Sequence, residues 1–470
     1  MKTFVKKILG FSVGPILGSL VSFITVPLTT FFISPSQMGK ASMFTVIQGL
    51  VVSFIYLGID QAYTREYHYE PDEKKLIQNA ILVPMSFALI VSVLLIFFSK
   101  EFSVWMFESP RYSYVAYLFA VMCVGLVLER FILLLIRMRE RSGEYSLFTV
   151  SLKVLILLTT VILIFTRKRD FLTIVYSTII GQLLGDGVLF LRYRHYILPK
   201  FSEYDFSLIK RMCMFGFPLI ISVSLTNLLN TMDRLFLRGF STYSELGIYT
   251  AALKVAAIVQ LVQSAFTTFW VPTAYRWNKE HRDMKVYVFV SQLVLFIFTL
   301  FFFGLLFTKK FIVLILSSQY SDAQFVIGLL ALTPVLYTIS ETTTLGIVFS
   351  GKSYYNIWVS VIAFVPNIIL NFLLIKPFGT VGAAISTATA YLLFFIGRTY
   401  FSKKCGFAIP STNLTINCIL LFIAGILSSL RNNYSYILVI VVFLICLISQ
   451  RGFYYKLYDV IKHPDKWNLD

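Results

Sequence analysis

The chain has 470 residues, of which 57% are hydrophobic and only 14% are charged, and its mean hydropathy is +0.79. This composition excludes an ordinary soluble globular domain. The net charge of +18 does not indicate nucleic-acid binding, because Lys and Arg lie in short segments between apolar runs and no basic soluble domain is present.

About fourteen apolar runs, each long enough to cross a bilayer, fill almost the whole sequence. The first run is too long for the apolar core of a signal peptide, so we expect it to be a membrane helix. We expect helices at 9–33, 41–61, 77–99, 112–136, 145–166, 171–192, 213–237, 246–271, 286–307, 323–349, 356–376, 379–401, 414–430 and 434–451. The basic segments obey the positive-inside rule best when both termini are cytoplasmic. The sequence therefore predicts an all-α, multi-pass membrane protein.

The second half of the sequence echoes the first. The turn 36–39 resembles the turn 244–247, and Ser177-Thr178 resembles Ser386-Thr387 at a similar separation. A repeat of six helices re-enters the membrane in its original direction, so we expect two parallel-repeat lobes with a binding site between them near the midplane. The expected parts are an N-terminal lobe (1–205), a C-terminal lobe (206–405) and an extra helix pair with a cytoplasmic tail (406–470).

Ionisable side chains inside membrane helices indicate function, because each costs about 2.5–3.5 kcal/mol on insertion scales. In the expected helix 213–237, Asn227, Asn230 and Arg234 recur at i, i+3 and i+7 and form one polar stripe. We expect Arg234 to face a central cavity and bind an anionic head group, with Asp233 tuning it. The alternative is a local salt bridge near the outer interface.

Lys254 has no acidic neighbour on its own helix, and a buried lysine either loses its proton or finds an anion. For Arg130, Lys153 and Glu341, contacts between helices remain the alternative to a role in the cavity, and Asp186 is a second candidate carboxylate. The candidates are Arg234, Lys254, Arg130, Lys153, Asn227 and Asn230 for the anionic head group, and Asp233, Glu341 and Asp186 for ion coupling.

Residues 346–353, with the sequence GIVFSGKS, satisfy the P-loop pattern. That pattern needs a preceding strand and a soluble α/β domain to hold a nucleotide, so we expect no ATP binding here. The sequence contains no catalytic triad and no cluster of metal ligands, and its loops are short. We therefore expect no enzyme activity, no cofactor and no metal; a membrane glycosyl or acyl transferase would gather acidic or histidine residues in long loops.

The segment LGIDQAYTREY at 57–67 resembles the bacterial polysaccharide repeat-unit flippases, a branch of the superfamily that also holds the multidrug (MATE) exporters. Segments 233–237, 246–252 and 366–384 agree with the same family. The resemblance implies a two-lobed transporter in the bacterial inner membrane. Such a transporter moves undecaprenyl-diphosphate-linked O-antigen or capsule units from the cytoplasmic to the outer leaflet by alternating access, beside the polysaccharide polymerase machinery.

In that family, cationic residues lining the cavity hold the diphosphate, and by position Arg234 and Lys254 are the best matches. The first lobe departs from the pattern, because the position equivalent to Asp233 lies near Thr30. The alternatives are a flippase for a peptidoglycan or teichoic-type precursor, a cation-coupled multidrug exporter, and a structural membrane subunit. The coupling ion, H⁺ or Na⁺, stays open beside a drive by membrane potential alone.

Overall fold

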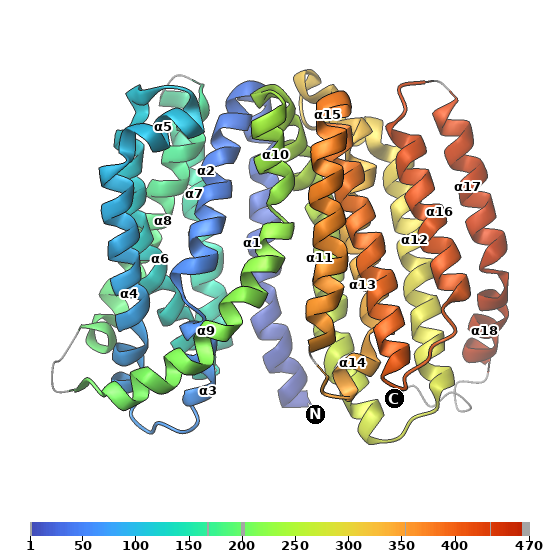
Figure 1. Cartoon of the computed structure of the whole chain (residues 1–470), viewed down its shortest axis with the longest axis horizontal. Helices are drawn as coiled ribbons and strands as arrows, with labels where there is room; N and C mark the ends of the chain where they lie inside the picture. Colours follow the sequence, from blue (N-terminus) through green and yellow to red (C-terminus); the bar gives the residue numbers. More distant parts are fainter. Residues whose placement is uncertain (1, 167–168, 199–202, 353, 433, 463–470) are drawn as a thin grey trace. The chain divides into compact units, whose positions relative to one another are not determined.

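The computed structural model describes residues 2–166, 169–198, 203–352, 354–432 and 434–462. Every regular element in these ranges is a helix, which confirms the predicted all-α class. The chain separates into two compact units, Met1–Leu235 and Phe236–Asp470 (Figure 1). The finer division at residues 205 and 405 stays a prediction.

Unit 1 contains the helices of the first half of the chain. They are α1 (Lys2–Phe32), α2 (Pro35–Ile55), α3 (Ile59–Glu66), α4 (Glu73–Phe97), α5 (Ser99–Phe107), η1 (Pro110–Tyr112), α6 (Tyr114–Met138), α7 (Ser142–Thr166), α8 (Phe171–Ile197) and α9 (Phe206–Leu229), and α10 (Met232–Phe240) crosses the boundary between the units.

Unit 2 contains the remaining helices. They are α11 (Tyr243–Lys279), α12 (Met284–Leu314), η3 (Ser318–Phe325), α13 (Ile327–Thr343), α14 (Leu345–Phe349), α15 (Tyr354–Lys404), α16 (Thr412–Ser429), α17 (Ser435–Ser449) and α18 (Arg451–Lys462).

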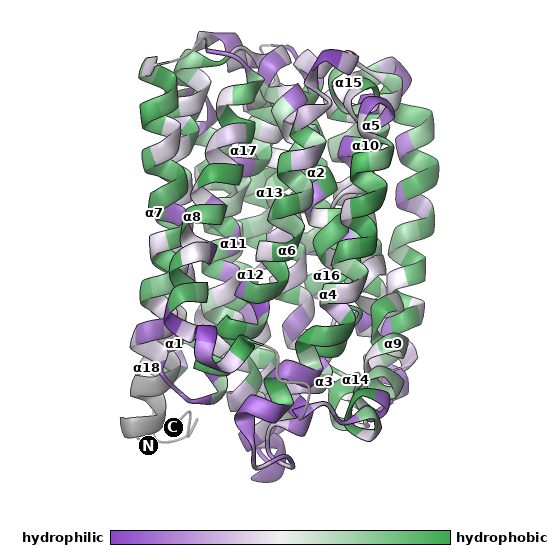
Figure 2. Ribbon diagram, turned by 90° about the vertical axis from the view of Figure 1, so that its left-hand side faces the viewer, coloured by the Kyte–Doolittle hydropathy of each residue, from purple (hydrophilic) through white to green (hydrophobic). Residues whose placement is uncertain are grey.

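Ten helices in the described ranges are long and apolar enough to cross a membrane, or up to twelve spans if each of two bent helix pairs counts as one. Hydrophobic residues predominate along the helices, and hydrophilic residues gather at the helix ends and connections (Figure 2). Apolar side chains on the outer faces match a hydrocarbon environment, in which all backbone polar groups must be satisfied within the helix. The chain is therefore a multi-pass membrane protein.

One helix lies at the centre of each unit. In unit 1, α6 packs against α4 and α8, and Phe119, Phe131 and Leu135 are fully buried there. In unit 2, α13 packs against α11, α12, α15 and α16, and nearly all of its side chains are buried. Because α6 and α13 correspond to the fourth expected span of each repeat, the two units have the same kind of core.

The helix α15 folds back on itself at Gly379, the one position inside it with non-helical angles (φ 51°, ψ −127°). Its 51 residues at about 1.5 Å each would reach about 75 Å, more than twice the thickness of a hydrocarbon core. A Cβ added to Gly397 would lie 3.8 Å from the Cα of Val359, and the rings of Tyr355 and Phe401 stack at 4.8 Å. The expected spans 356–376 and 379–401 are thus the two arms of one hairpin.

Three expected spans are broken: 41–61, 213–237 and 323–349, the last of which is divided among the end of η3, α13 and α14. The expected helix 41–61 ends at Ile55 and resumes as α3 after Leu57 and Gly58, which both have positive φ (50° and 69°). The expected continuous helix 213–237 is wrong, because the structure ends α9 at Leu229 and starts α10 at Met232. At this second break the Thr231 hydroxyl donates to the Asn227 carbonyl oxygen at 2.6 Å, a side-chain bond that competes with the helical ladder.

Candidate functional site

The break between α2 and α3 lies against α9. A Cβ on Gly58 would collide with the backbone of Gly216 in α9, so only a glycine permits this close approach. The positive φ of Gly58 is the second reason for glycine at this position. The break therefore turns α3 away from α2 and brings Asp60 towards the interior of unit 1.

A pocket of about 210 Å³ opens at this break. Its lining contains side chains of α2, α3, α6 and α9, most of them polar. They are Val52, Ser53, Tyr56, Gly58, Asp60, Gln61, Arg130, Ile220 and Asn227. The structure thus brings together two of the predicted residues, Arg130 and Asn227, although 97 positions separate them (227 − 130 = 97).

Arg130 is held by three contacts. Its Nη2 and Nε donate to the Oδ2 atom of Asp60 at 2.6 and 3.2 Å. Its guanidinium carbon lies 5.5 Å from the ring centre of Tyr56, whose hydroxyl donates to the Leu126 carbonyl oxygen. The Arg130 side chain remains 39% exposed, against 10% for Asp60, so part of the guanidinium faces the pocket.

A second polar group lies beside this pair and joins α6 to α8. The amide nitrogen of Gln182 donates to the Glu129 carboxylate at 2.6 Å and to the Asp186 carboxylate at 2.8 Å. Lys153 on α7 is exposed, and its positive charge acts on Glu129. Its aliphatic stem packs on α1 at Gly18, where an added Cβ would lie 3.3 Å from the Lys153 Cγ. Asp186 and Lys153 were predicted from the sequence, whereas Gln182 was not.

In unit 2, Glu341 is buried at the interface of α13 with α11. The Thr267 hydroxyl donates to the Glu341 Oε2 atom at 2.6 Å, and the Trp270 indole N–H donates to the backbone carbonyl of Glu341 at 3.2 Å. Both donors come from α11. The carboxylate is thus placed in a polar site inside one unit, as its position in a polar run suggested.

Arg398 of α15 is a charged residue in the same neighbourhood that the sequence analysis did not single out. Its Nη1 atom donates to the Ser340 hydroxyl at 3.0 Å, and its guanidinium lies over the rings of Tyr337 and Phe394 at 4.7 and 4.4 Å. Its charge also acts on Glu341. Arg398 lies close to Lys403 and Lys404, so in the sequence it is indistinguishable from a basic helix end.

The remaining predicted residues lie on α10, α11 and the turn before α10. Asn230 is exposed in that turn, and Asp233 and Arg234 occupy the first turn of α10, so Asn227 and Arg234 do not share one helix. Lys254 is partly buried on α11 and has no ion pair with any residue in the described ranges.

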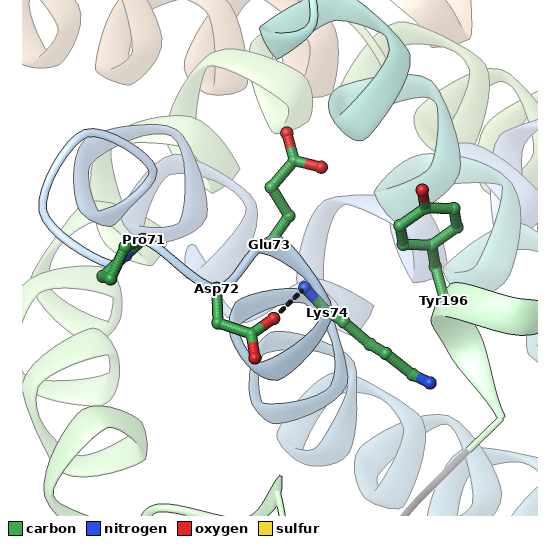
Figure 3. A pocket seen from close by; sticks show the side chains of 5 residues that line it. All are labelled: Pro71, Asp72, Glu73, Lys74 and Tyr196. Carbon is green, nitrogen blue, oxygen red and sulfur yellow. Dashed lines mark hydrogen bonds between the residues drawn. The ribbon is translucent and has the colours of Figure 1, made fainter.

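A larger pocket of about 470 Å³ lies at the start of α4, where Pro71, Asp72, Glu73, Lys74 and Tyr196 line it (Figure 3). Asp72 caps α4 by accepting the backbone N–H of Lys74 at 2.9 Å, and Glu73 accepts hydrogen bonds from Arg139 and Tyr67. Burial, followed by the hydrogen bond to Glu73, raises the pKa of Tyr67 to about 12. Both acids that line this pocket therefore already have hydrogen-bond partners.

The start of α9 is fixed by Asp205. Its carboxylate accepts the Ser207 hydroxyl at 2.7 Å, the Leu208 backbone N–H at 3.2 Å and the Lys75 ammonium at 2.9 Å. These bonds, that of Ser207 first, lower the pKa of Asp205 below its usual value. Asp205 thereby anchors α9, the helix that supplies Asn227 to the pocket, on α4.

The P-loop-like segment contains α14 and the turn at Gly351, whose φ is +68°, and Ser353 lies outside the described residues. No strand precedes the segment in the part of the chain that the structure describes.

The fold is the one seen in solved structures of membrane flippases and multidrug exporters. The structure of the lipid II flippase MurJ in an inward closed conformation aligns over 97% of this chain and 99% of that one, with a TM-score of 0.71 and 15% identity. An inward-facing multidrug resistance MATE transporter of the MOP superfamily aligns over 84% of this chain and 95% of that one, with a TM-score of 0.59 and 13% identity.

The family described as "Polysaccharide biosynthesis protein" matches residues 4–278, more than half of the chain. The chain therefore belongs to that family, which confirms at this level the resemblance drawn from the sequence motifs. A curated relative, the probable low-salt glycan biosynthesis flippase Agl15 of Haloferax volcanii, is 27% identical over 164 residues, which cover 34% of this chain and 35% of that protein. The chain thus spans about a third of the length of this relative.

Proposed function

We propose that this protein is a flippase for lipid-linked oligosaccharides. It moves undecaprenyl-diphosphate-linked repeat units of an O-antigen or capsule polysaccharide from the cytoplasmic to the outer leaflet by alternating access. The observation that carries the proposal is the family match over residues 4–278, a segment that includes Arg130, Arg234 and Lys254. The word "flippase" in the name of the curated relative supports the same class of activity.

The charges of the interior support an anionic substrate. Lys254 has no ion-pair partner in the described ranges, and a lysine in such a place is stabilised by an anion such as a phosphate. Arg130 is different, because Asp60 already compensates its charge. We therefore propose Lys254 and, by its position in the family motif, Arg234 as two separate candidates for contact with the diphosphate. Contacts with sugar hydroxyl groups are proposed for the pocket with Arg130, Gln61 and Asn227.

The membrane potential supplies part of the driving force. It is worth about 2.3 kcal/mol per elementary charge per 100 mV, so outward movement of a head group with about two negative charges gains about 4–5 kcal/mol per 100 mV. A flippase of this kind needs no nucleotide site. Glu341 and Asp233 are the acids where antiport of H⁺ or Na⁺ would add to the drive, and Asp186 is a further candidate for ion coupling.

A peptidoglycan precursor is the second candidate substrate. The observation in its favour is that the fold similarity to the lipid II flippase extends over 97% of this chain, whereas the similarity to the MATE transporter covers 84%. In either case the protein acts in the cytoplasmic membrane as a transporter with both termini cytoplasmic, beside the polysaccharide polymerase machinery.

The test measures lipid-linked sugars in cells that lack the gene. The deletion strain is complemented with the wild type, with Arg234→Ala combined with Lys254→Ala, and with Lys310→Ala as a control. We expect polyprenyl-diphosphate oligosaccharide to accumulate in the deletion strain, and the wild type and the control, but not the double variant, to clear it.

Two results contradict the proposal. If no lipid-linked sugar accumulates and the cells become sensitive to cationic drugs, the protein is a multidrug exporter. If lipid II accumulates instead, the substrate is the peptidoglycan precursor. The same membranes, fractionated for lipid II and for oligosaccharide lipids, separate the two flippase substrates.

A further inference from the structure

Two carboxylates of unit 1 converge on a single amide. Gln182 on α8 donates one hydrogen bond to Glu129 of α6 and another to Asp186, one turn further along α8. Asp186 is only 5% exposed and Glu129 is partly buried. The two negative charges also act on each other across the helix interface.

The Gln182 amide does not satisfy Asp186 completely. The Oδ2 atom of Asp186 is buried and accepts no hydrogen bond from any described residue. It lies against the backbone of α6 at Gly125, where an added Cβ would collide with it. A buried ionised oxygen without a donor is costly, and the usual response of such a group is to bind a proton.

The charged groups that act on this pair come from α3, α6 and α7. Arg130 of α6 is paired with Asp60 of α3, and the charges of Lys153 of α7 and Arg130 both act on Glu129. The Tyr56 hydroxyl at the end of α2 interacts with the same set. Three carboxylates thus face two cations, and the group carries one excess negative charge when every acid is ionised.

We propose that Glu129 and Asp186 form a proton-binding site that holds one proton between them. One proton cancels the excess charge, and two interacting carboxylates titrate as a unit. A divalent cation fits less well, because Mg²⁺ and Ca²⁺ take about six or more oxygen ligands. The described residues also contain no group of three His, Cys, Asp or Glu side chains placed to hold a metal.

The site gives the transporter a means of coupling, and this role rests on the proposed function. An anionic head group that passes Lys153 reduces the positive charge acting on Glu129. Proton binding then becomes more favourable, and by linkage a bound proton favours the anion by the same factor. Release of the head group and release of the proton therefore assist each other.

The site is tested on the purified full-length protein by infrared difference spectroscopy of the C=O stretch of protonated carboxyl groups during a pH titration. We expect the wild type to keep one such band at neutral pH, and both Asp186→Asn and Glu129→Gln to lose it. Glu101→Gln, an exposed acid of α5, is the matched control and should keep it. Asp60→Asn removes one negative charge, so its band should disappear at a pH lower by at least about one unit.

A wild-type protein without the band, or a band that survives both Asp186→Asn and Glu129→Gln, overturns the proposal. Loss of the band on addition of NaCl at constant ionic strength also overturns it, because the site then binds Na⁺ in place of a proton. The infrared spectrum is recorded without any transport of a lipid-linked substrate. A protein that shows the expected bands but does not clear lipid-linked sugars therefore refutes the proposed function and leaves the proton site standing.

Discussion

Asp60 and Arg130 join α3 to α6 by two hydrogen bonds to one carboxylate oxygen, at 2.6 and 3.2 Å. The bond depends on the break after α2, because Leu57 and Gly58 turn the chain just before Asp60. The ion pair therefore connects an irregular segment of the backbone to the central helix of unit 1, at the edge of the pocket that Asn227 also lines.

Removal of either partner of this pair should destabilise unit 1. We expect Asp60→Ala and Arg130→Ala each to cost about 1–3 kcal/mol, because the remaining charged group loses its partner in a partly buried site. The double variant should cost less than the sum of the two, which a double-mutant cycle on thermal unfolding in detergent measures. Strict additivity of the two effects would show that the pair contributes nothing to stability.

Gly58→Ala should be strongly destabilising, whereas Gly49→Ala should be neutral or stabilising. The first adds a Cβ at a φ of +69° and against the Gly216 backbone, and the left-handed conformation alone costs about 1–2 kcal/mol. Gly49 has nothing within 4 Å of its added Cβ, so alanine there gains about 0.5–1 kcal/mol of helix propensity. Melting temperatures of the two variants measure the contrast, and equal values would contradict the close packing of α3 on α9.

Loss of the Thr267 hydroxyl should lower the stability of the protein, whereas loss of the neighbouring Thr268 hydroxyl should not. Thr267→Val removes the donor at 2.6 Å from the Glu341 carboxylate, and we expect a loss of about 1–3 kcal/mol. Thr268→Val is the matched control, because the exposed Thr268 hydroxyl bonds only to the Ser264 carbonyl of its own helix. Thermal unfolding compares the two, and similar losses would show that the contact with Glu341 is not the cause.

Acidification should weaken the anchor of α9 through Asp205. Its pKa is lower in the folded state than in the unfolded chain, so its stabilisation is present above the unfolded value of about 3.9. The stabilisation is lost as the pH falls through the folded value. We expect Asp205→Asn to unfold at lower temperature at neutral pH and to lose less on acidification than the wild type. A variant whose melting temperature follows the wild type at every pH would contradict this assignment.

The membrane helices were predictable from hydropathy, because a span of apolar residues must be helical in lipid. The breaks were not. Nothing in the sequence LGID indicates that Leu57 adopts a positive φ. The i, i+3 and i+7 spacing of Asn227, Asn230 and Arg234 predicts one continuous helix, which the structure breaks after Leu229. Both breaks depend on local backbone geometry, which the apolar content of a segment does not encode.

Some charged members of the candidate site were predictable from the sequence, whereas Asp60, Glu129 and the grouping of these side chains were not. Arg130 and Asp186 stood out because a charge in an apolar run is costly. Gln182 was not predicted, because an uncharged side chain in an apolar run carries no comparable cost. Its amide nevertheless joins the Glu129 and Asp186 carboxylates. The ion pair of Asp60 with Arg130 joins residues 70 positions apart, and only packing of α3 on α6 decides that they meet.

The hairpin of α15 has a consequence for how the protein enters the membrane. Its two arms meet at Gly379 with no polar loop between them. During synthesis, no hydrophilic segment therefore separates the first arm from the second. The translocation machinery must therefore accept both arms as one unit. Lys352 before the first arm and Lys403 and Lys404 at the end of the second lie at the open end, against Lys376 alone near the tip. The positive-inside rule predicts that these three lysines stay on the cytoplasmic side and so set the direction in which the pair is inserted.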